Sequence, residues 1–239
     1  LSAWNVSSVT DMSGMFSRAT KFKQDLSNWN VSNVEDMSYM FNQAEEFDSD
    51  IGEWKVGNVT DMHGMFAFAT SFNQDLSKWK VGNVTDMANM FYKATSFNQD
   101  LNKWKVGNVR RVSGMFHQAT NFNQDLSNWK LSSVTSMRNM FAHAKKFNGN
   151  ISRWEVSQVT DMEGMFDQAT NFNQDLSNWN VSNVADMRFM FYNATSFKQD
   201  LSKWKVSQFT KSFRMFGGIL SFFEIGHMPV ELRSRTDLY

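Results

Sequence analysis

The chain has 239 residues, and its 24 Lys and Arg residues balance its 24 Asp and Glu residues, so the formal net charge is zero. This balance argues against a dedicated nucleic-acid-binding protein, although it is compatible with local charged patches. The lack of cysteine excludes disulfides and thiolate metal sites. No apolar run reaches the roughly 18 residues of a membrane-spanning helix, so we expect no membrane insertion by this segment.

One 25-residue motif occurs nine times, without insertion or deletion between the tryptophans that mark it. All nine tryptophans lie on one column: Trp4, Trp29, Trp54, Trp79, Trp104, Trp129, Trp154, Trp179 and Trp204. Each repeat is numbered here from its first residue, so Leu1 is position 1 and Trp4 is position 4. A fixed period of this length predicts a solenoid in which each repeat contacts mainly its neighbours. We expect residues 1–216 to form this body, and a start already in register at Leu1 indicates a fragment of a longer protein.

Apolar residues occupy positions 1, 4, 6, 9, 12, 15, 16, 19 and 22 of the repeat. Positions 4 and 6 alternate with polar neighbours, which predicts a short half-buried strand. Positions 12, 15, 16 and 19 have the spacing of one helix face, and Thr at position 10 followed by Asp is typical of a helix N-cap. The sequence therefore predicts an α/β, right-handed, leucine-rich-repeat-like solenoid with one short parallel strand and one short helix per repeat, the strands lining the concave face.

Positions 3 and 5 flank the tryptophan and are expected to point outward from the predicted strand, onto the concave face. Together they hold nine basic and two acidic residues. Concave solenoid faces are binding surfaces, and a lysine stripe favours an anionic partner. The alternative is that these lysines only keep an exposed sheet soluble. The predicted ligand-binding residues are Lys55, Lys78, Lys80, Lys103, Lys105, Lys130 and Arg153.

Position 25 is a column of aspartates that includes Asp75, Asp100 and Asp125. Like charges stacked about 5 Å apart repel one another unless something compensates. Calcium could compensate, since repeated carboxylate oxygens coordinate it. Alternatively, each Asp could accept hydrogen bonds from backbone N–H groups and so hold a corner of the repeat. The glycine-rich calcium motif is missing, which favours the corner role.

No catalytic constellation stands apart from the repeat, because each polar group recurs in nearly identical copies. The methionines at positions 12 and 15 fall on the core-facing side, where Met fills irregular gaps. The four histidines share no metal-site spacing and are expected at the solvated surface: His63, His117, His143 and His227. We therefore expect no enzymatic activity and no cofactor other than the calcium considered above.

The repeat pattern fades after Trp204 and Val206, where Phe209, Ser212 and Ile219 depart from their columns. Terminal repeats often depart from consensus because they cover the open end of the core. Residues 217–239 are therefore predicted to form a C-terminal cap, the alternative being a truncated junction to another domain.

The pattern Trp-x-Val-Ser-Asn-Val-Thr-Asp-Met-x-x-Met-Phe, followed by Phe-Asn-Gln-Asp-Leu-Ser, resembles the BspA-type leucine-rich-repeat surface proteins over about residues 1–216. The resemblance implies an extracellular, cell-surface location, often as a lipoprotein, and a role in adhesion and protein binding rather than catalysis. This chain departs from ordinary leucine-rich repeats, because Val stands where their ladder-forming Asn stands. The Asn-Gln-Asp corner at positions 23 to 25 is expected to take over that ladder role.

Three functions follow as hypotheses. The first is a non-enzymatic cell-surface binding or adhesion module whose lysine-rich face recognises an anionic macromolecule. Its partner would be a host or neighbouring-cell protein or an acidic glycan; nucleic acid is disfavoured because no aromatic platform interleaves with the lysines. The second is a structural spacer or stalk that presents another domain. The third is a calcium-stabilised adhesin.

Overall fold

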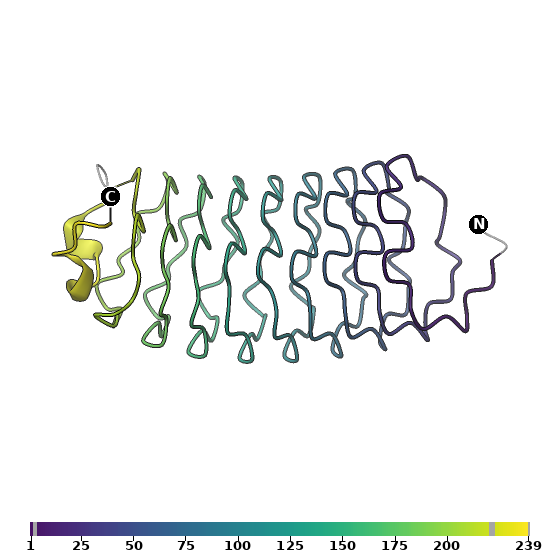
Figure 1. Ribbon diagram of the computed structural model, residues 1–239, viewed down its shortest axis with the longest axis horizontal. Coiled ribbons are helices and arrows are strands. Elements are labelled where there is room, and N and C mark those ends of the chain that lie inside the picture. Colours follow the sequence, from purple (N-terminus) through teal and green to yellow (C-terminus); the bar gives the residue numbers. More distant parts are fainter. Residues whose placement is uncertain (2–3, 220–222, 239) are drawn as a thin grey trace.

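The structure is a computed structural model that describes residues 1, 4–219 and 223–238. The nine repeats follow one another as turns of a single elongated solenoid, with the two termini at opposite ends (Figure 1). The predicted repeat solenoid is therefore confirmed.

The secondary structure predicted within each repeat is not formed in the described part of the chain. Its only helices are two 3-10 helices near the C-terminus, η1 (Ile225–His227) and η2 (Val230–Leu232). Four-residue turns succeed one another around repeats 1 to 8 instead, closed by backbone hydrogen bonds over positions 1–4, 6–9, 12–15, 16–19 and 19–22. The prediction of a strand at positions 4 to 6 and of a helix over positions 12 to 19 is therefore wrong.

The turns explain why the sequence resembles a helix. Each turn buries its first and fourth residues, so two turns in series reproduce the i, i+3, i+4, i+7 spacing of a helix face. A right-handed helix is prevented because positions 14 and 18 have positive φ in all nine repeats, for example 59° at Phe68 and 55° at Asn89. A positive φ at the third residue is what a type II turn requires, and it interrupts a right-handed helix.

Neighbouring repeats are joined by a backbone ladder over positions 10 to 18, which we call the ladder side. The N–H groups of Met62, Phe66 and Phe68 donate to the carbonyls of Asp86, Met90 and Tyr92 at 3.0, 2.9 and 2.6 Å. Isolated parallel bridges link position 11 of successive repeats, as in Asp61 and Asp86. The expected parallel pairing thus lies at the segment that was predicted to be helical.

The threonines at position 10 join repeats rather than cap helices. The Thr60 hydroxyl donates to the carbonyl of Glu35 at 3.2 Å, and the Thr85 hydroxyl donates to the carbonyl of Thr60 at 3.3 Å. The N-cap prediction is therefore wrong, and the hydroxyls of Thr60, Thr85, Thr160 and Thr210 instead donate to a carbonyl of the preceding repeat.

The core consists of side-chain columns that run the length of the solenoid. Trp79 stacks on Trp104 at 6.4 Å between ring centroids, with an interplanar angle of 1°. The phenylalanines at positions 16 and 22 stack in the same way, and methionines such as Met62 and Met65 are fully buried. The indole N–H of Trp104 donates to the carbonyl of Leu76 in the preceding repeat at 3.0 Å, so burial leaves no unpaired donor on the ring.

The repeats are spaced unequally on the two sides of this core. Stacked tryptophans are 6.3 to 6.5 Å apart, whereas the phenylalanines at position 16 are 5.5 to 5.9 Å apart. The ladder holds its backbones at a strand-like separation of about 4.8 Å. Turns of the chain spread along one edge and converge along the other (Figure 1). The tryptophan side is therefore the outer side of the curve and the ladder side is the inner side.

Asparagine ladders fasten the corners of the repeats. At position 23, the Asn98 side-chain oxygen accepts hydrogen bonds from the Asn123 backbone N–H at 2.8 Å and from the Gln124 side chain at 3.0 Å. This finding confirms that the Asn-Gln-Asp corner ties successive repeats together. A second ladder at position 8 was not predicted, and in it Asn108 donates to the carbonyl of Gly82 at 2.7 Å.

A second period of 50 residues is superimposed on the first. Position 14 is Gly in repeats 1, 3, 5 and 7, and a larger residue in the repeats between them. A Cβ atom on Gly64 would lie 2.8 Å from the Tyr39 ring, and one on Gly114 would lie 2.3 Å from the Asn89 side-chain oxygen. Each glycine thus leaves room for the side chain of the preceding repeat.

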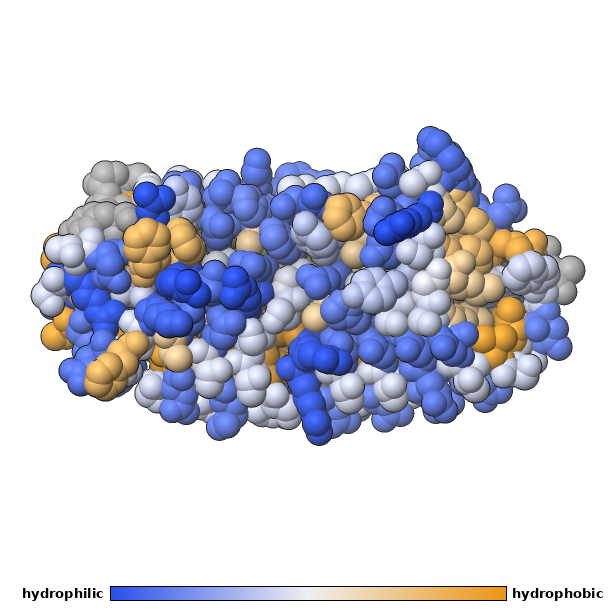
Figure 2. All heavy atoms as spheres, viewed as in Figure 1, coloured by the Kyte–Doolittle hydropathy of each residue, from blue (hydrophilic) through white to orange (hydrophobic). Residues whose placement is uncertain are grey.

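The last described residues pack against the end of the core. The centroid of the Phe223 ring lies 4.8 Å from that of Phe216 and 5.9 Å from that of Phe197. The Arg235 guanidinium donates to the carbonyls of Thr210 and Gln208, both at 2.6 Å. On the face drawn in Figure 2, hydrophobic surface gathers towards the two ends and the middle is mostly hydrophilic. In the described residues, no helix has the length and apolar character needed to span a bilayer.

Candidate binding surface beside the tryptophan column

The seven basic residues predicted to bind a ligand lie together on the tryptophan side, and we call them the lysine face: Lys55, Lys78, Lys80, Lys103, Lys105, Lys130 and Arg153. They occupy positions 3 and 5, on either side of a buried tryptophan, and all seven side chains are exposed. The turn over positions 1–4 buries the tryptophan, so its two neighbours point to solvent. Two rows of basic groups therefore run along the solenoid axis.

The lysine face does not line a concave surface. It lies on the side where repeats are 6.4 Å apart, which is the outer side of the curve. The concave placement was derived from strands at positions 4 to 6, and these strands are replaced by turns. The wider spacing opens gaps between neighbouring repeats instead.

Three open hollows follow the lysine face, each beside the tryptophan of an odd-numbered repeat. The first has a volume of about 350 Å³ and is lined by Gly52, Glu53, Trp54, Lys55, Val56, Gly57, Lys78 and Lys80. The second, of about 510 Å³, is lined by Asn102, Lys103, Trp104, Lys105, Val106, Gly107, Asn128 and Lys130. The third, of about 330 Å³, includes Arg153 and Glu155. A Cβ atom on Gly57 or Gly107 would meet no atom within 4 Å, so these glycines help to leave the space open.

Few acidic groups neutralise these cations. Lys78 forms an ion pair with Glu53, and this hydrogen bond raises the pKa of Lys78. Within the described residues, no ion pair within 4 Å involves the other six members of the lysine face. The surface thus presents unpaired, exposed positive charge in a chain of zero net charge.

The aspartates at position 25 hold the corner of the repeat. Asp75, Asp100 and Asp125 each accept a hydrogen bond from the backbone N–H two residues on, at 2.8, 2.8 and 2.7 Å. The backbone hydrogen bond from Ser77 lowers the pKa of Asp75. Across residues 1, 4–219 and 223–238, no group of three or more His, Asp or Glu side chains is arranged to hold a metal ion. These contacts support the corner role that was weighed against calcium.

Three of the histidines lie in the ladder side rather than on a freely solvated surface. The His117 ring lies 4.9 Å from the tilted Tyr92 ring and stacks on His143 at 5.7 Å, and burial lowers the pKa of His117 to about 4. His63 packs against Tyr39 at 4.8 Å. Sequence reasoning missed these contacts because the histidines occupy different positions of the repeat: His63 is at position 13, His117 at position 17 and His143 at position 18.

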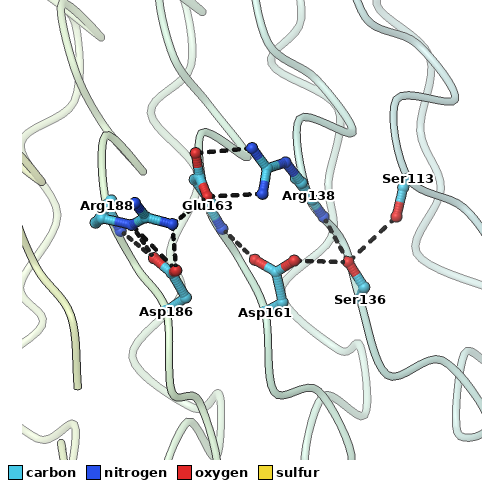
Figure 3. Close-up of polar contacts among 7 residues, drawn as sticks. All are labelled: Ser113, Ser136, Arg138, Asp161, Glu163, Asp186 and Arg188. Atoms are coloured by element: carbon cyan, nitrogen blue, oxygen red, sulfur yellow. Dashed lines mark hydrogen bonds and ion pairs between the residues drawn. The ribbon is translucent and has the colours of Figure 1, made fainter. Parts of the chain in front are cut away.

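A polar network covers the ladder side of repeats 5 to 8 (Figure 3). The Glu163 carboxylate forms ion pairs with Arg138 at 2.8 Å and with Arg188 at 2.7 Å. Arg188 also forms an ion pair with Asp186 at 2.7 Å. Ser136 donates to Asp161 at 3.1 Å. Both arginines of this network are paired with carboxylates, whereas six members of the lysine face form no ion pair within 4 Å among the described residues.

Solved structures with similar folds include leucine-rich-repeat proteins. A chain of the Drosophila Toll–Spätzle complex matches 84% of this chain over 30% of its own length, with 11% identity and a TM-score of 0.34. A leucine-rich-repeat protein of Leptospira interrogans matches 74% of this chain and 57% of its own, with 10% identity and a TM-score of 0.33. The chain thus spans less than two thirds of either protein. No curated protein sequence matches it.

The repeat sequence itself gives a definite match. The family model described as "Mycoplasma protein of unknown function, DUF285" matches residues 1–67, 50–137 and 124–225, which together cover all nine tryptophans. With its 25-residue aromatic repeats, the chain belongs to this family.

Proposed function

We propose that this chain is a non-enzymatic binding module of the cell exterior whose lysine face engages an anionic macromolecule. In this proposal it is a right-handed solenoid related to the BspA-type leucine-rich-repeat surface proteins, and it serves in adhesion. The observation that carries the proposal is the set of unpaired basic side chains around the first two hollows. Lys55 and Lys80 border the first hollow, and Lys103, Lys105 and Lys130 border the second.

The electrostatics favour a polyanionic partner. Two unit charges at the 6.4 Å spacing of the repeats repel by about 0.6 kcal/mol in bulk water, and more beside a protein surface. A chain of negative groups along both rows would relieve this repulsion at several positions at once. Salt would screen the attraction, because the Debye length falls to about 8 Å at physiological ionic strength.

The solenoid's elongated form supports the second hypothesis, a spacer that presents another domain. Its side-chain columns and ladders run through all nine repeats and give an elongated body. A spacer needs no ligand, so its lysines would serve solubility alone. The two functions differ in what happens when the charges are reversed.

The test is binding to an array of acidic glycans, acidic proteins and other polyanions at low and physiological salt. The wild type is compared with a variant carrying Lys55→Glu, Lys80→Glu, Lys105→Glu and Lys130→Glu. A matched control changes four exposed lysines elsewhere: Lys145→Glu, Lys146→Glu, Lys198→Glu and Lys211→Glu. The proposal expects binding that weakens with salt, is lost in the first variant and persists in the control. Equal loss in both variants, or no binding by the wild type, would favour the spacer.

A further inference from the structure

We infer that the second hollow of the lysine face, at Lys103, Lys105 and Lys130, is the primary subsite for an acidic polysaccharide. This inference rests on the proposed function and narrows it to one ligand class and one place. The three hollows share one architecture, since each opens beside a tryptophan and extends towards the next repeat. They differ in charge and in hydrogen-bonding groups, and these differences rank them.

The charge of the lining is greatest in the second hollow. Its lining contains three lysines and no acidic residue, so its net charge is plus three. The first hollow also has three lysines, but Glu53 is among its lining residues and pairs with Lys78, which leaves a charge of two. In the third hollow the positive charge of Arg153 is offset by the negative charge of Glu155, so the lining has no net charge. An anion is therefore attracted most strongly to the second hollow.

Two carboxamide side chains make the second hollow suitable for a sugar. Asn102 stands at position 2, where seven repeats have Ser. Its side-chain oxygen accepts the backbone N–H of Asn128 at 2.9 Å, and within the described residues no hydrogen bond uses its Nδ2 group. Asn128 lines the same hollow from the next repeat. Ammonium groups bind carboxylates, while amide groups donate to and accept from hydroxyls. A polymer of uronic acids carries both groups, whereas an acidic peptide side chain offers only the carboxylate.

The first hollow would then hold a second part of the same polymer. It lies two repeats away, or roughly 13 Å if each repeat adds the 6.4 Å that separates Trp79 from Trp104. A ligand that spans both hollows gains affinity because its second contact is intramolecular. Affinity should therefore rise once an oligomer is long enough to reach from one hollow to the other.

The experiment measures binding of size-fractionated oligogalacturonates, with poly-L-glutamate of equal carboxylate number and neutral dextran as comparison probes. The central variant is Lys103→Gln with Lys105→Gln. Its control is Lys203→Gln with Lys205→Gln, which changes the same positions in the last repeat. A third variant, Asn102→Ser, keeps the charge and restores the usual residue. Thermal unfolding confirms that each variant is folded before binding is compared.

We expect long oligogalacturonates to bind at least tenfold more tightly than short ones and than poly-L-glutamate. The central variant should lose tenfold or more in affinity for oligogalacturonate, and the control should lose less than twofold. Asn102→Ser should weaken the binding of oligogalacturonate but not that of poly-L-glutamate. Equal losses in both lysine pairs, or equal affinity for poly-L-glutamate, would overturn the subsite and leave the proposed function standing. Failure of the wild type to bind any polyanion at low salt would overturn both.

Discussion

The Asn89 side-chain oxygen lies 2.3 Å from the point where a Cβ atom on Gly114 would stand. The two residues share position 14 in adjacent repeats, and Gly114 has a φ of 63°. The absence of a side chain at Gly114 therefore allows the Asn89 side chain to extend over the next repeat. The same relation holds between Asn139 and Gly164.

We expect Gly114→Ala to destabilise the protein by about 1–3 kcal/mol, because it adds a steric conflict to a left-handed backbone. The matched control is Gly107→Ala, where a Cβ atom meets nothing within 4 Å, and its effect should stay near zero. Adding Asn89→Gly to Gly114→Ala should restore part of the loss. Chemical denaturation of the four proteins measures this, and equal destabilisation by the two Ala variants would contradict the steric account.

The indole hydrogen bonds predict that Trp104→Phe costs about 2–4 kcal/mol. The substitution removes the indole hydrogen bond to the Leu76 carbonyl, which keeps only its turn hydrogen bond from the Trp79 N–H, and it opens space in a stacked column. Trp4→Phe is the control, because Trp4 is 55% exposed. We expect that variant to change the free energy of unfolding by less than about 0.5 kcal/mol. Similar values for the two variants would show that the hydrogen bond and the stacking contribute little.

Stability should fall with acidification through His117. Burial, with smaller electrostatic contributions from His143 and Lys93, lowers the pKa of His117 to about 4, against about 6.5 in the unfolded chain. Between these values the unfolded chain binds a proton that the folded chain does not. This stabilising contribution is therefore complete above about pH 6.5 and is lost as the pH falls towards 4.

The measurement is the free energy of unfolding between pH 7 and 4.5 for the wild type, His117→Gln and the cap variant His227→Gln. We expect the wild type to lose up to about 2 kcal/mol more than His117→Gln over this range. His227→Gln should follow the wild type. Parallel curves for the wild type and His117→Gln would contradict the assignment of this pH dependence to His117.

The sequence was sufficient for the solenoid and its core, because a fixed period places identical side chains above one another. It was not sufficient for the path of the chain within a repeat. Met62, Met65, Phe66 and Ala69 have helical spacing, yet they are the ends of two adjacent turns, each of which contains a left-handed third residue. Glycine marks position 14 in only four repeats, and non-glycine residues such as Phe68 adopt positive φ at position 18 of repeats 1 to 8, so the turns carry no consistent glycine signal in the sequence.

The lysine face was predictable as a set of residues but not as a surface shape. Position 3 and position 5 project outward whether the segment around the tryptophan is a strand or a turn. Which side of the solenoid is concave depends on where the backbones pair most closely, and that depends on the ladder over positions 10 to 18. The asparagine ladder at position 23 was predictable because Asn98 and its equivalents form an obvious column. The stacking of His117 on His143 was not, because the two residues differ in position.

The corner role of the aspartates predicts that chelation leaves stability unchanged. Asn150 occupies the same position as Asp125 and accepts the same kind of backbone hydrogen bond, from Ser152 at 3.0 Å, without a carboxylate charge. Asp100→Asn should therefore cost less than about 0.5 kcal/mol, whereas Asp100→Ala, which removes the acceptor, should cost about 1 kcal/mol. The measurement is the Tm of the wild type and both variants with EDTA and with added calcium. A Tm that falls on chelation and recovers with calcium would show that the column binds the ion, since a backbone hydrogen bond is indifferent to it.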